Sequence, residues 1–444
     1  MRSEWKKTRL GDCISLRGGF AYKSEFLGRG ESLLFGMGVV SHTEKFLLSG
    51  AREYSGIAPE THKTQPGELV IATRQQSDNM PILGAPGFVP KELKGKNLIV
   101  GANLYKVTNI SSISNDFLYW LMKGDDYKNR ILECSKGSTV RMITKDAIED
   151  FVFYCPPVDE RNRIVNVLNT IDDRITLLRE TNATLEAIAQ TLFKSWFVDF
   201  DPVHARAGGE QPAGLPPEVA ALFPDSFEES ALGMIPKGWN TGTLGDVAHF
   251  QNGYAFKSKD WCESGHPVVK IGDVKPGIID FSGCSYIAPE TTEGLSRFKL
   301  RRGDLLVGMT GYVGETGLVP HVEPHAYLNQ RVGRIATKSG LIDLGFVYCL
   351  VRNSAFKGYA EARSHGSAQA NVSGAVLLDY PVVTPTQNIL DRFNGSVGVL
   401  LERILSNHEQ AQTLATLRDT LLPRLISGQL RLPDAKQQLK DLAV

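Results

Sequence analysis

The hydrophobic positions of the chain form two long stretches with the spacing of an amphipathic helix. From Ile164 to Trp196 mostly apolar residues recur alternately every four and three positions, and the same alternation runs from Phe393 to Leu425. Such an alternation over more than four heptads is typical of a coiled-coil seam. A proline stands just before each stretch, where helix-start signals are expected. The pattern predicts one central and one C-terminal long helix that pair with each other.

Two globular segments lie outside these helices. Each contains a short apolar run, LVIAT at 69–73 and LLVGMT at 305–310, bounded by glycine and proline residues that favour turns. Each also contains a stretch that predicts a helix, at 115–132 and 344–362. The mixture predicts α+β domains.

The two halves of the chain repeat one another. Trp5 begins WKKTRLGDCISLRGGFAYKS, and Trp239 begins WNTGTLGDVAHFQNGYAFKS at an offset of 234. Farther along the offset settles at 229, as for Pro156 and Pro385. Halves of this length are too long for solenoid repeats, so they indicate a tandem duplication.

The expected fold is α+β, with two tandem globular α/β domains separated by two long antiparallel coiled-coil helices in a pseudo-two-fold duplication. The expected boundaries are a first domain at 1–155, a central helical spacer at 156–200, an acidic linker at 201–238, a second domain at 239–385, a C-terminal helical spacer at 386–430 and a tail at 431–444.

One polar residue interrupts each seam. Asn182 is the sixth of ten seam positions in the first helix, and Asn407 is the fifth of ten in the second. In an antiparallel pair the sixth position faces the fifth, so the two amides would meet, and a buried amide pair fixes register. The alternative is that each asparagine lies on the wet edge of its seam.

The composition is that of an ordinary globular protein, with 42% hydrophobic and 22% charged residues. The sequence contains no run of eighteen apolar residues and no secretion signal at its start. Its six cysteines are scattered without a CxxC pair, which argues against a zinc finger or a disulfide framework. We therefore expect a cytoplasmic protein.

The charge is unevenly distributed although the formal net charge is zero. Residues 1–155 hold 21 Lys and Arg against 17 Asp and Glu, whereas residues 156–238 hold 7 against 13. A weakly basic first domain fits either an ordinary solvated surface or a face that binds phosphate.

The stretch LFKSWFVDFDPV at 192–203 combines aromatic residues with two acids. Its counterpart LLPRLISG, which begins at Leu421, keeps the seam but lacks both the aromatics and the acids, so a duplicated catalytic site is not indicated. Phe193, Phe197 and Phe200 lie off the predicted seam, where an aromatic stripe packs on a domain or docks a partner.

The helical segments carry a family resemblance. PPVDERNRIVNVLNTIDDRITLLRETNATLEAIAQTLFKSWFVDFDP, from Pro156 to Pro202, resembles the central helical region of type I restriction–modification specificity subunits. LRDTLLPRLISGQLRL, from Leu417 to Leu432, is similar to the C-terminal helical region of the same family. The order globular, helix, globular, helix also matches, so the resemblance covers essentially the whole chain.

The resemblance implies a binding function. Each globular domain would be a target-recognition domain that reads one half of a bipartite duplex DNA sequence. The paired helices would set the distance between half-sites and dock two copies of a methyltransferase subunit, and a motor–nuclease subunit would join for restriction. Duplex DNA has a local two-fold axis that suits a pseudo-symmetric reader.

Catalytic motifs are missing from the sequence. A DNA methyltransferase needs a glycine-rich turn for its methyl donor and an Asn/Asp-Pro-Pro-aromatic motif for the flipped base, and neither is present. There is no GxxxxGK[ST] loop, and the pair His321 and His325 lacks further metal ligands. We expect no catalytic residue, cofactor or metal. The rival hypotheses are a self-contained methyltransferase or restriction enzyme, and a decayed relative that only scaffolds partners.

Candidate DNA-binding residues lie in loops rich in the side chains that contact base edges and phosphates. The repeated Lys–Ser pairs suit phosphate contact, and residues that differ between the halves suit reading of different half-sites. For each loop the alternative is a solvated turn. The candidates are Lys23, Ser24, Arg74, Gln75, Gln76, Lys136, Ser138, Thr139, Arg141, Lys257, Ser258, Thr310, Tyr312, Asn329, Gln330, Arg331, Arg363, His365, Ser367, Gln369 and Asn371.

Overall fold

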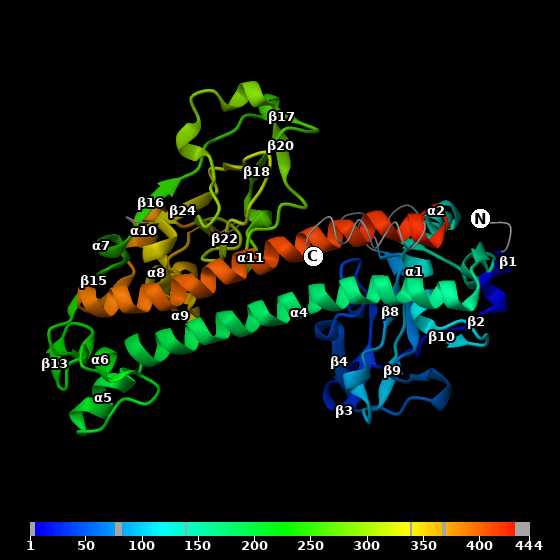
Figure 1. The fold of residues 1–444 in the computed structure, drawn as a ribbon, viewed down its shortest axis with the longest axis horizontal. Helices are drawn as coiled ribbons and strands as arrows, with labels where there is room; N and C mark the ends of the chain where they lie inside the picture. Colours follow the sequence, from blue (N-terminus) through cyan, green and yellow to red (C-terminus); the bar gives the residue numbers. More distant parts are fainter. Residues whose placement is uncertain (1–4, 76–81, 138–139, 338–339, 366–369, 431–444) are drawn as a thin grey trace. The chain divides into compact units, whose positions relative to one another are not determined.

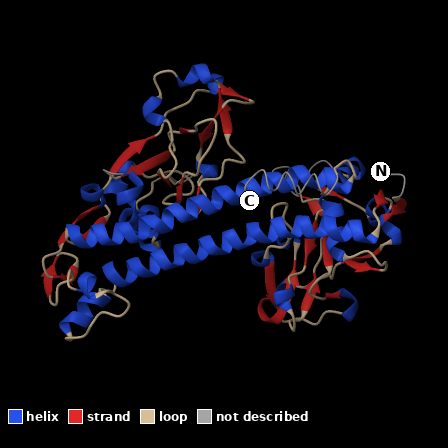
Figure 2. Ribbon diagram, in the orientation of Figure 1, coloured by secondary structure: helices blue, strands red, loops and turns tan. Residues whose placement is uncertain are grey.

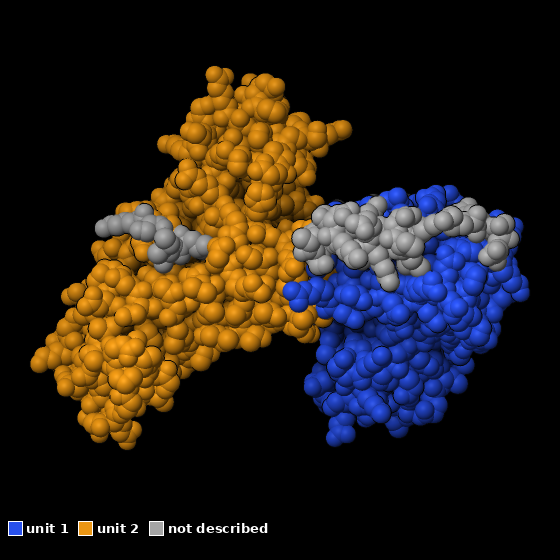
Figure 3. All heavy atoms as spheres, viewed as in Figure 1, with its two compact units in different colours: residues 1–174, 414–444 blue, residues 175–413 orange. Residues whose placement is uncertain are grey.

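The structure is a computed structural model that describes residues 5–75, 82–137, 140–337, 340–365 and 370–430. The chain forms two compact units, one of residues 1–174 and 414–444 and one of residues 175–413 (Figure 3). Each unit contains one globular domain together with parts of both long helices (Figure 1).

The two predicted long helices are present as α4 (Val158–Phe197) and α11 (Gln387–Ile426). They pair antiparallel: in unit 1 Arg418 of α11 contacts Asp172 of α4, and in unit 2 Phe393 of α11 contacts Trp196 of α4. Every predicted seam position is buried or half-buried. The periodicity of four and three therefore identified the side of each helix that is removed from water.

The strands of unit 1 form two four-stranded sheets and two further strand pairs, β1 with β12 and β7 with β11. Strands are drawn red in Figure 2. One sheet has the order β2–β10–β6–β8, and the other has the order β4–β3–β9–β5. Strand β1 pairs antiparallel with β12, so the first and last strands of the domain are adjacent. The elements are β1 (Lys6–Arg9), β2 (Ile14–Gly18), β3 (Leu27–Phe35), β4 (Ala51–Tyr54), β5 (Lys63–Thr64), β6 (Leu69–Ala72), β7 (Arg74–Gln75), β8 (Pro86–Phe88), β9 (Leu98–Val100), β10 (Leu104–Asn109), α1 (Asn115–Lys123), α2 (Asp125–Cys134), β11 (Arg141–Met142), α3 (Lys145–Glu149) and β12 (Val152–Cys155).

Unit 2 repeats most of this topology, with an additional edge strand, β19, in its first sheet and a different edge strand, β17, in its second. Its sheets have the orders β16–β24–β21–β22–β19 and β17–β20–β18–β23, and β15 pairs with β25 as β1 pairs with β12. The elements are β15 (Asn240–Thr243), α7 (Leu244–Val247), β16 (His249–Asn252), β17 (Trp261–Cys262), β18 (His266–Val269), β19 (Gly277–Ile278), β20 (Ser285–Ile287), β21 (Leu305–Gly308), β22 (Thr316–Leu318), β23 (Tyr327–Leu328), β24 (Val332–Ala336), α8 (Leu344–Arg352), α9 (Ser354–Ala362), α10 (Gly374–Leu378) and β25 (Pro381–Thr384). The shared order of the first four strands of the larger sheet and the shared closing pair confirm the tandem duplication.

The helices predicted at 115–132 and 344–362 are each interrupted, which corrects the sequence prediction. Gly124 and Asn353 adopt extended backbone angles, and each divides its segment into two helices. The amide side chain of Asn353 accepts a hydrogen bond from the N–H of Ala355 and so caps α9. The apolar periodicity continues across both breaks, which is why it did not reveal them.

The acidic linker 201–238 is folded in unit 2. It contains α5 (Asp201–Ala207), α6 (Pro217–Ala220) and an antiparallel hairpin of β13 (Phe227–Ser230) and β14 (Gly233–Pro236). Val203 and Phe223 of the linker are buried in the hydrophobic core of the unit. The linker is thus part of the core rather than a free connection.

Candidate nucleic-acid interface

A glycine repeated in both halves fixes the start of the first candidate loop. A Cβ atom on Gly19 would lie 1.9 Å from the carbonyl oxygen of Gly101, and one on Gly253 would lie 2.0 Å from that of Asn329. Only glycine permits this approach of two backbones. The following residues, Phe20 and Tyr254, form matching parallel bridges. The repeated glycine therefore holds the Lys–Ser turns in equivalent places in the two domains.

In unit 1, two of the candidate loops are joined by backbone hydrogen bonds. Strand β7, which follows β6 closely, pairs with β11, so Arg74 lies opposite Met142 and Gln75 opposite Arg141. Lys136 pairs with Met142 on the other side. The N–H of Thr73 donates to the carbonyl oxygen of Asn103 at 2.9 Å, which adds a third loop. We call this set, residues 73–75, 101–103, 136–137 and 140–142, the unit 1 rim.

Unit 2 contains the same arrangement. Thr310 pairs with Asn371, and His365 pairs with Asn371 as Lys136 pairs with Met142. The N–H of Met309 donates to the carbonyl oxygen of Arg331 at 3.1 Å, as Thr73 donates to Asn103. We call residues 309–312, 329–331, 363–365 and 370–371 the unit 2 rim. Loops that are distant in the sequence are thus brought together in each domain.

The side chains of the rims and turns differ in exposure. Gln75 is 4% exposed, and its Oε1 accepts from the N–H of Leu83, while Asn329 is 8% exposed. Thr310 is 7% exposed and its hydroxyl donates to Oδ1 of Asn371 at 2.8 Å. These three shape the rims. Arg141 is half-buried. The exposed candidates are Lys23, Ser24, Arg74, Lys136, Lys257, Ser258, Tyr312, Gln330, Arg331, Arg363, His365 and Asn371.

Several candidates lie outside the described residues, namely Gln76, Ser138, Thr139, Ser367 and Gln369.

Asn103 is a further candidate that the sequence does not single out. It occupies the place in the unit 1 rim that Arg331 occupies in the unit 2 rim, and its φ of 70° is unusual for a residue other than glycine. Asparagine tolerates this conformation better than most residues, which is the signal that could have indicated it. A half-buried amide at this position can reach a base edge.

The aromatic stripe packs within unit 2. The ring centroid of Phe197 lies 4.8 Å from that of Phe393, 5.0 Å from Phe346 and 5.8 Å from Trp239. Phe200 lies 5.7 Å from Trp239. Of the two predicted roles, the structure thus shows packing on the domain. Placing the stripe off the seam was partly wrong, since Phe193 and Phe197 also contact Phe393 of α11.

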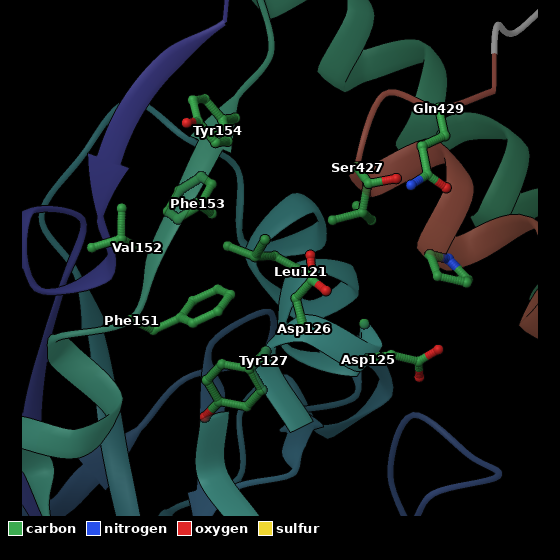
Figure 4. A pocket seen from close by; sticks show the side chains of 13 residues that line it. Leu121, Asp125, Asp126, Tyr127, Phe151, Val152, Phe153, Tyr154, Ser427 and Gln429 are labelled. Carbon is green, nitrogen blue, oxygen red and sulfur yellow. The ribbon is translucent and has the colours of Figure 1, made fainter. Parts of the chain in front are cut away.

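Unit 1 has a pocket where unit 2 has this stripe. The pocket has a volume of about 380 Å³ and lies between β12, the start of α2 and the end of α11 (Figure 4). Ile426 and Gln429 line it, and at the offset of 229 their counterparts are Phe197 and Phe200. At these two positions unit 1 therefore carries smaller side chains than unit 2.

Each domain is attached to a long helix by polar contacts. In unit 1, Nε1 of Trp120 donates to Oδ1 of Asn169 on α4 at 2.8 Å, and Lys45 pairs with Asp173 at 3.4 Å. In unit 2, Arg302 pairs with Glu402 of α11 at 2.8 Å, and Glu402 is the counterpart of Asp173 at the offset of 229. Equivalent helix positions therefore hold both domains, although the two cations come from different loops.

Two buried groups beside the helices titrate far from their usual ranges. In unit 1, burial and, to a smaller extent, the nearby Arg418 lower the pKa of the Lys123 ammonium to about 7, and Nζ of Lys123 donates to the carbonyl oxygen of Ser41 at 2.6 Å. In unit 2, burial and the carboxylate of Glu186 raise the pKa of the Tyr348 hydroxyl, which donates to Glu186. Lys123 thus joins α1 to the loop at Ser41 within the first domain, and Tyr348 joins α8 to α4.

The described residues contain no group of three or more His, Cys, Asp or Glu side chains placed to hold a metal ion. Within the same residues, no helix is long and apolar enough to cross a membrane.

Two domains of related topology, each with a polar rim of loops and each attached to the long helices, form the arrangement that the sequence resemblance to DNA-specificity subunits implies. Residues 2–187 and 236–417 match the family described as the type I restriction modification DNA specificity domain. The chain belongs to this family, and it is a specificity subunit with two target-recognition domains. Such subunits recognise DNA within type I restriction–modification systems.

Individual specificity subunits are similar in sequence to this chain over nearly its whole length. The type I restriction enzyme HindI specificity subunit of Haemophilus influenzae is 26% identical over 96% of this chain and 100% of its own length. The MjaVIII specificity subunit of Methanocaldococcus jannaschii is 24% identical over 96% of this chain and 93% of its own. The crystal structure of a type I system S subunit from M. genitalium covers 95% of this chain and 96% of its own, with a TM-score of 0.53 at 17% identity, and shows the same fold.

Proposed function

We propose that each domain reads one half of a bipartite duplex DNA target through its rim. The observation that supports this is the duplication of the rim's backbone pairing with different side chains: Lys136 and Met142 in unit 1 correspond to His365 and Asn371 in unit 2. A shared backbone frame presents loops to DNA in the same way, and different side chains select different base edges.

The exposed Lys–Ser turns suit a role common to both domains. Lys23 and Lys257 lie at the start of equivalent 3₁₀ turns, at Ser24–Phe26 and Ser258–Asp260. A cation and a hydroxyl repeated in both halves suit contacts with the phosphate backbone, which carry no sequence information. The rims would then supply the sequence-specific contacts.

The proposed role of the chain is to bind DNA and partner subunits, and the chain itself catalyses no reaction. It docks two copies of a methyltransferase subunit on α4 and α11, and a motor–nuclease subunit joins for restriction, in the cytoplasm. The length of the helical spacer sets the distance between the half-sites. The chain's own residues provide binding and orientation, since the sequence lacks the methyl-donor and flipped-base motifs.

The decisive experiment exchanges residues 1–155 for the corresponding domain of another specificity subunit and sequences the methylated sites of the host. We expect one half of the methylated sequence to change and the other half to stay the same. An unchanged methylated sequence would refute the role of the first domain as a reader. Methyl transfer by the purified chain alone, with methyl donor added, would favour the self-contained enzyme instead.

Arginine substitutions in the rims test individual contacts. Arg331→Ala in unit 2 and Arg141→Ala in unit 1 are expected to weaken binding to the specific duplex by about 1–3 kcal/mol each, the usual range for a good bidentate contact. Binding is measured by fluorescence anisotropy at one fixed salt concentration. Arg392→Ala, which removes the same charge from the exposed side of α11, is the control and should change affinity less than about twofold. If one of the two rim variants binds the specific duplex as tightly as the unaltered chain does, the arginine replaced in that variant does not contact the DNA.

A further inference from the structure

The seam between α4 and α11 contains a buried ion pair in one unit only. In unit 1, Nη1 of Arg418 lies 2.6 Å from Oδ1 of Asp172, and both side chains are 8% exposed. At the offset of 229 the counterpart of Asp172 is Leu401 and the counterpart of Arg418 is Ala189. Both of these are fully buried in the core of unit 2. The duplicated seam is therefore ionic at one site and apolar at the equivalent site.

The asparagine pair likewise has apolar residues at the equivalent site of the other half. Nδ2 of Asn407 donates to Oδ1 of Asn182 at 2.9 Å, and Nδ2 of Asn182 donates to the carbonyl oxygen of Ile404 at 2.9 Å. The predicted contact between the two amides is thus present. The counterpart of Asn182 is Ala411 and that of Asn407 is Leu178, so this pair too has no polar equivalent.

These differences matter because the helices resemble one another. Two copies of the chain could pair α4 with α4 and α11 with α11 along the same seam, since the duplication places apolar residues at the same spacing in both helices. In the α4 pair Asp172 would face Ala189, and Asn182 would face Leu178. In the α11 pair Arg418 would face Leu401, and Asn407 would face Ala411.

Such a homotypic pair would separate Asp172 from Arg418 and Asn182 from Asn407. Asp172 would keep Lys45 at 3.5 Å and Arg418 would keep Asp419 at 2.9 Å, but each would lose its closest oppositely charged partner at a buried site. A buried charge that loses its partner is strongly destabilising, whereas replacing both partners with apolar groups is often neutral. A polar residue in a coiled-coil seam is known to fix register and partner choice in the same way. The cost falls on homotypic pairing alone, because pairing of α4 with α11 satisfies all four side chains.

We propose that the pairs Asp172–Arg418 and Asn182–Asn407 make α4 and α11 select each other and exclude pairing of either helix with its own copy in a second chain. The duplicated seam would otherwise allow a second copy of this chain as partner. The inference concerns the assembly of the chain and does not depend on DNA binding.

The test replaces the four polar seam residues with the apolar residues of the equivalent sites. Asp172→Leu with Arg418→Ala, and Asn182→Ala with Asn407→Leu, give each site the side chains of its counterpart. The reporter is Thr181→Cys in a Cys262→Ser background, because residue 181 flanks Asn182 near the centre about which two α4 helices would pair. Chains are unfolded, refolded at equal concentration and oxidised, and disulfide-linked dimers are measured on a non-reducing gel.

We expect the fourfold variant to give at least about five times more linked dimer than the unaltered seam, in proportion to the lost penalty. Exchange of α11 between chains keeps α4 paired with α11 and does not bring two residues 181 together, so it gives no signal. The matched control is Asp172→Arg with Arg418→Asp, which keeps one charge pair and should give the same low yield as the unaltered seam.

Two results would overturn the proposal. One is a fourfold variant that yields no more dimer than the unaltered seam. The other is a charge-exchanged control that dimerises as much as the fourfold variant. Weaker pairing of α4 with α11 would then explain the dimers, without any role for the loss of polar residues from the seam. If the fourfold variant does not refold, Asp172→Leu with Arg418→Ala alone decides the question by the same criteria, with an expected increase of at least about twofold.

Discussion

Arg418→Ala is expected to lower the free energy of unfolding by about 3 kcal/mol, near the lower end of the range for breaking a buried ion pair. The substitution removes the closest cation from the carboxylate of Asp172, which is 8% exposed and lies 3.5 Å from Lys45. Combining it with Asp172→Leu should recover most of the loss, because the double variant resembles the apolar counterpart in unit 2. Urea unfolding followed by circular dichroism measures both values.

Asp173→Ala is the matched control for this prediction. Asp173 is adjacent in α4 and pairs with Lys45, but its side chain is 74% exposed. Exposed pairs contribute little, so the loss should stay below about 1 kcal/mol. Equal losses for Arg418→Ala and Asp173→Ala would show that burial of the Asp172–Arg418 pair does not set its strength.

Phe197→Ala is expected to cost about 3–5 kcal/mol, the usual range for removing a buried phenyl ring. Phe197 is 6% exposed and contacts rings from α8, α11 and the start of the second domain. Its loss would loosen the linker and the helix pair together. The measurement is the thermal transition of unit 2 by calorimetry, which should shift to lower temperature.

Val198→Ala serves as the control, since Val198 directly follows Phe197 after the end of α4 and its side chain is 48% exposed. We expect it to change stability by less than about 0.5 kcal/mol, as for most surface substitutions. If the thermal transition of Phe197→Ala occurs at the same temperature as that of Val198→Ala, the structural role assigned to the aromatic stripe is wrong.

The long helices were predictable because their information is local. A period of 3.5 residues sets the buried side of a helix regardless of its surroundings, so the seam from Ile164 to Trp196 indicated both the helix and the need for a partner. Antiparallel pairing placed Asn182 opposite Asn407 but left open whether each amide lay on the wet edge of its seam, and the structure shows the contact. The breaks at Gly124 and Asn353 were missed because capping interrupts the backbone without interrupting the apolar pattern.

The rims were only partly predictable. Composition indicated the loops around Arg74, Lys136 and Arg141, but exposure within a loop depends on which strand it joins. In the sequence Gln75 is one of several neighbouring polar residues, and nothing distinguishes it from them. In the structure it lies on β7, which pairs with β11, and its side chain is buried. Asn103 was missed because only the hydrogen bond from Thr73 places it beside the other loops.

The sequence by itself determined the duplication, the two seams and the family resemblance, because periodicity and internal repetition are properties of residue order. Only the tertiary structure decided which loops meet in each rim, and that Asp172 faces Arg418 where the other half has Leu401 and Ala189. Those contacts join residues far apart in the chain, and their energies depend on burial, which residue order alone does not specify.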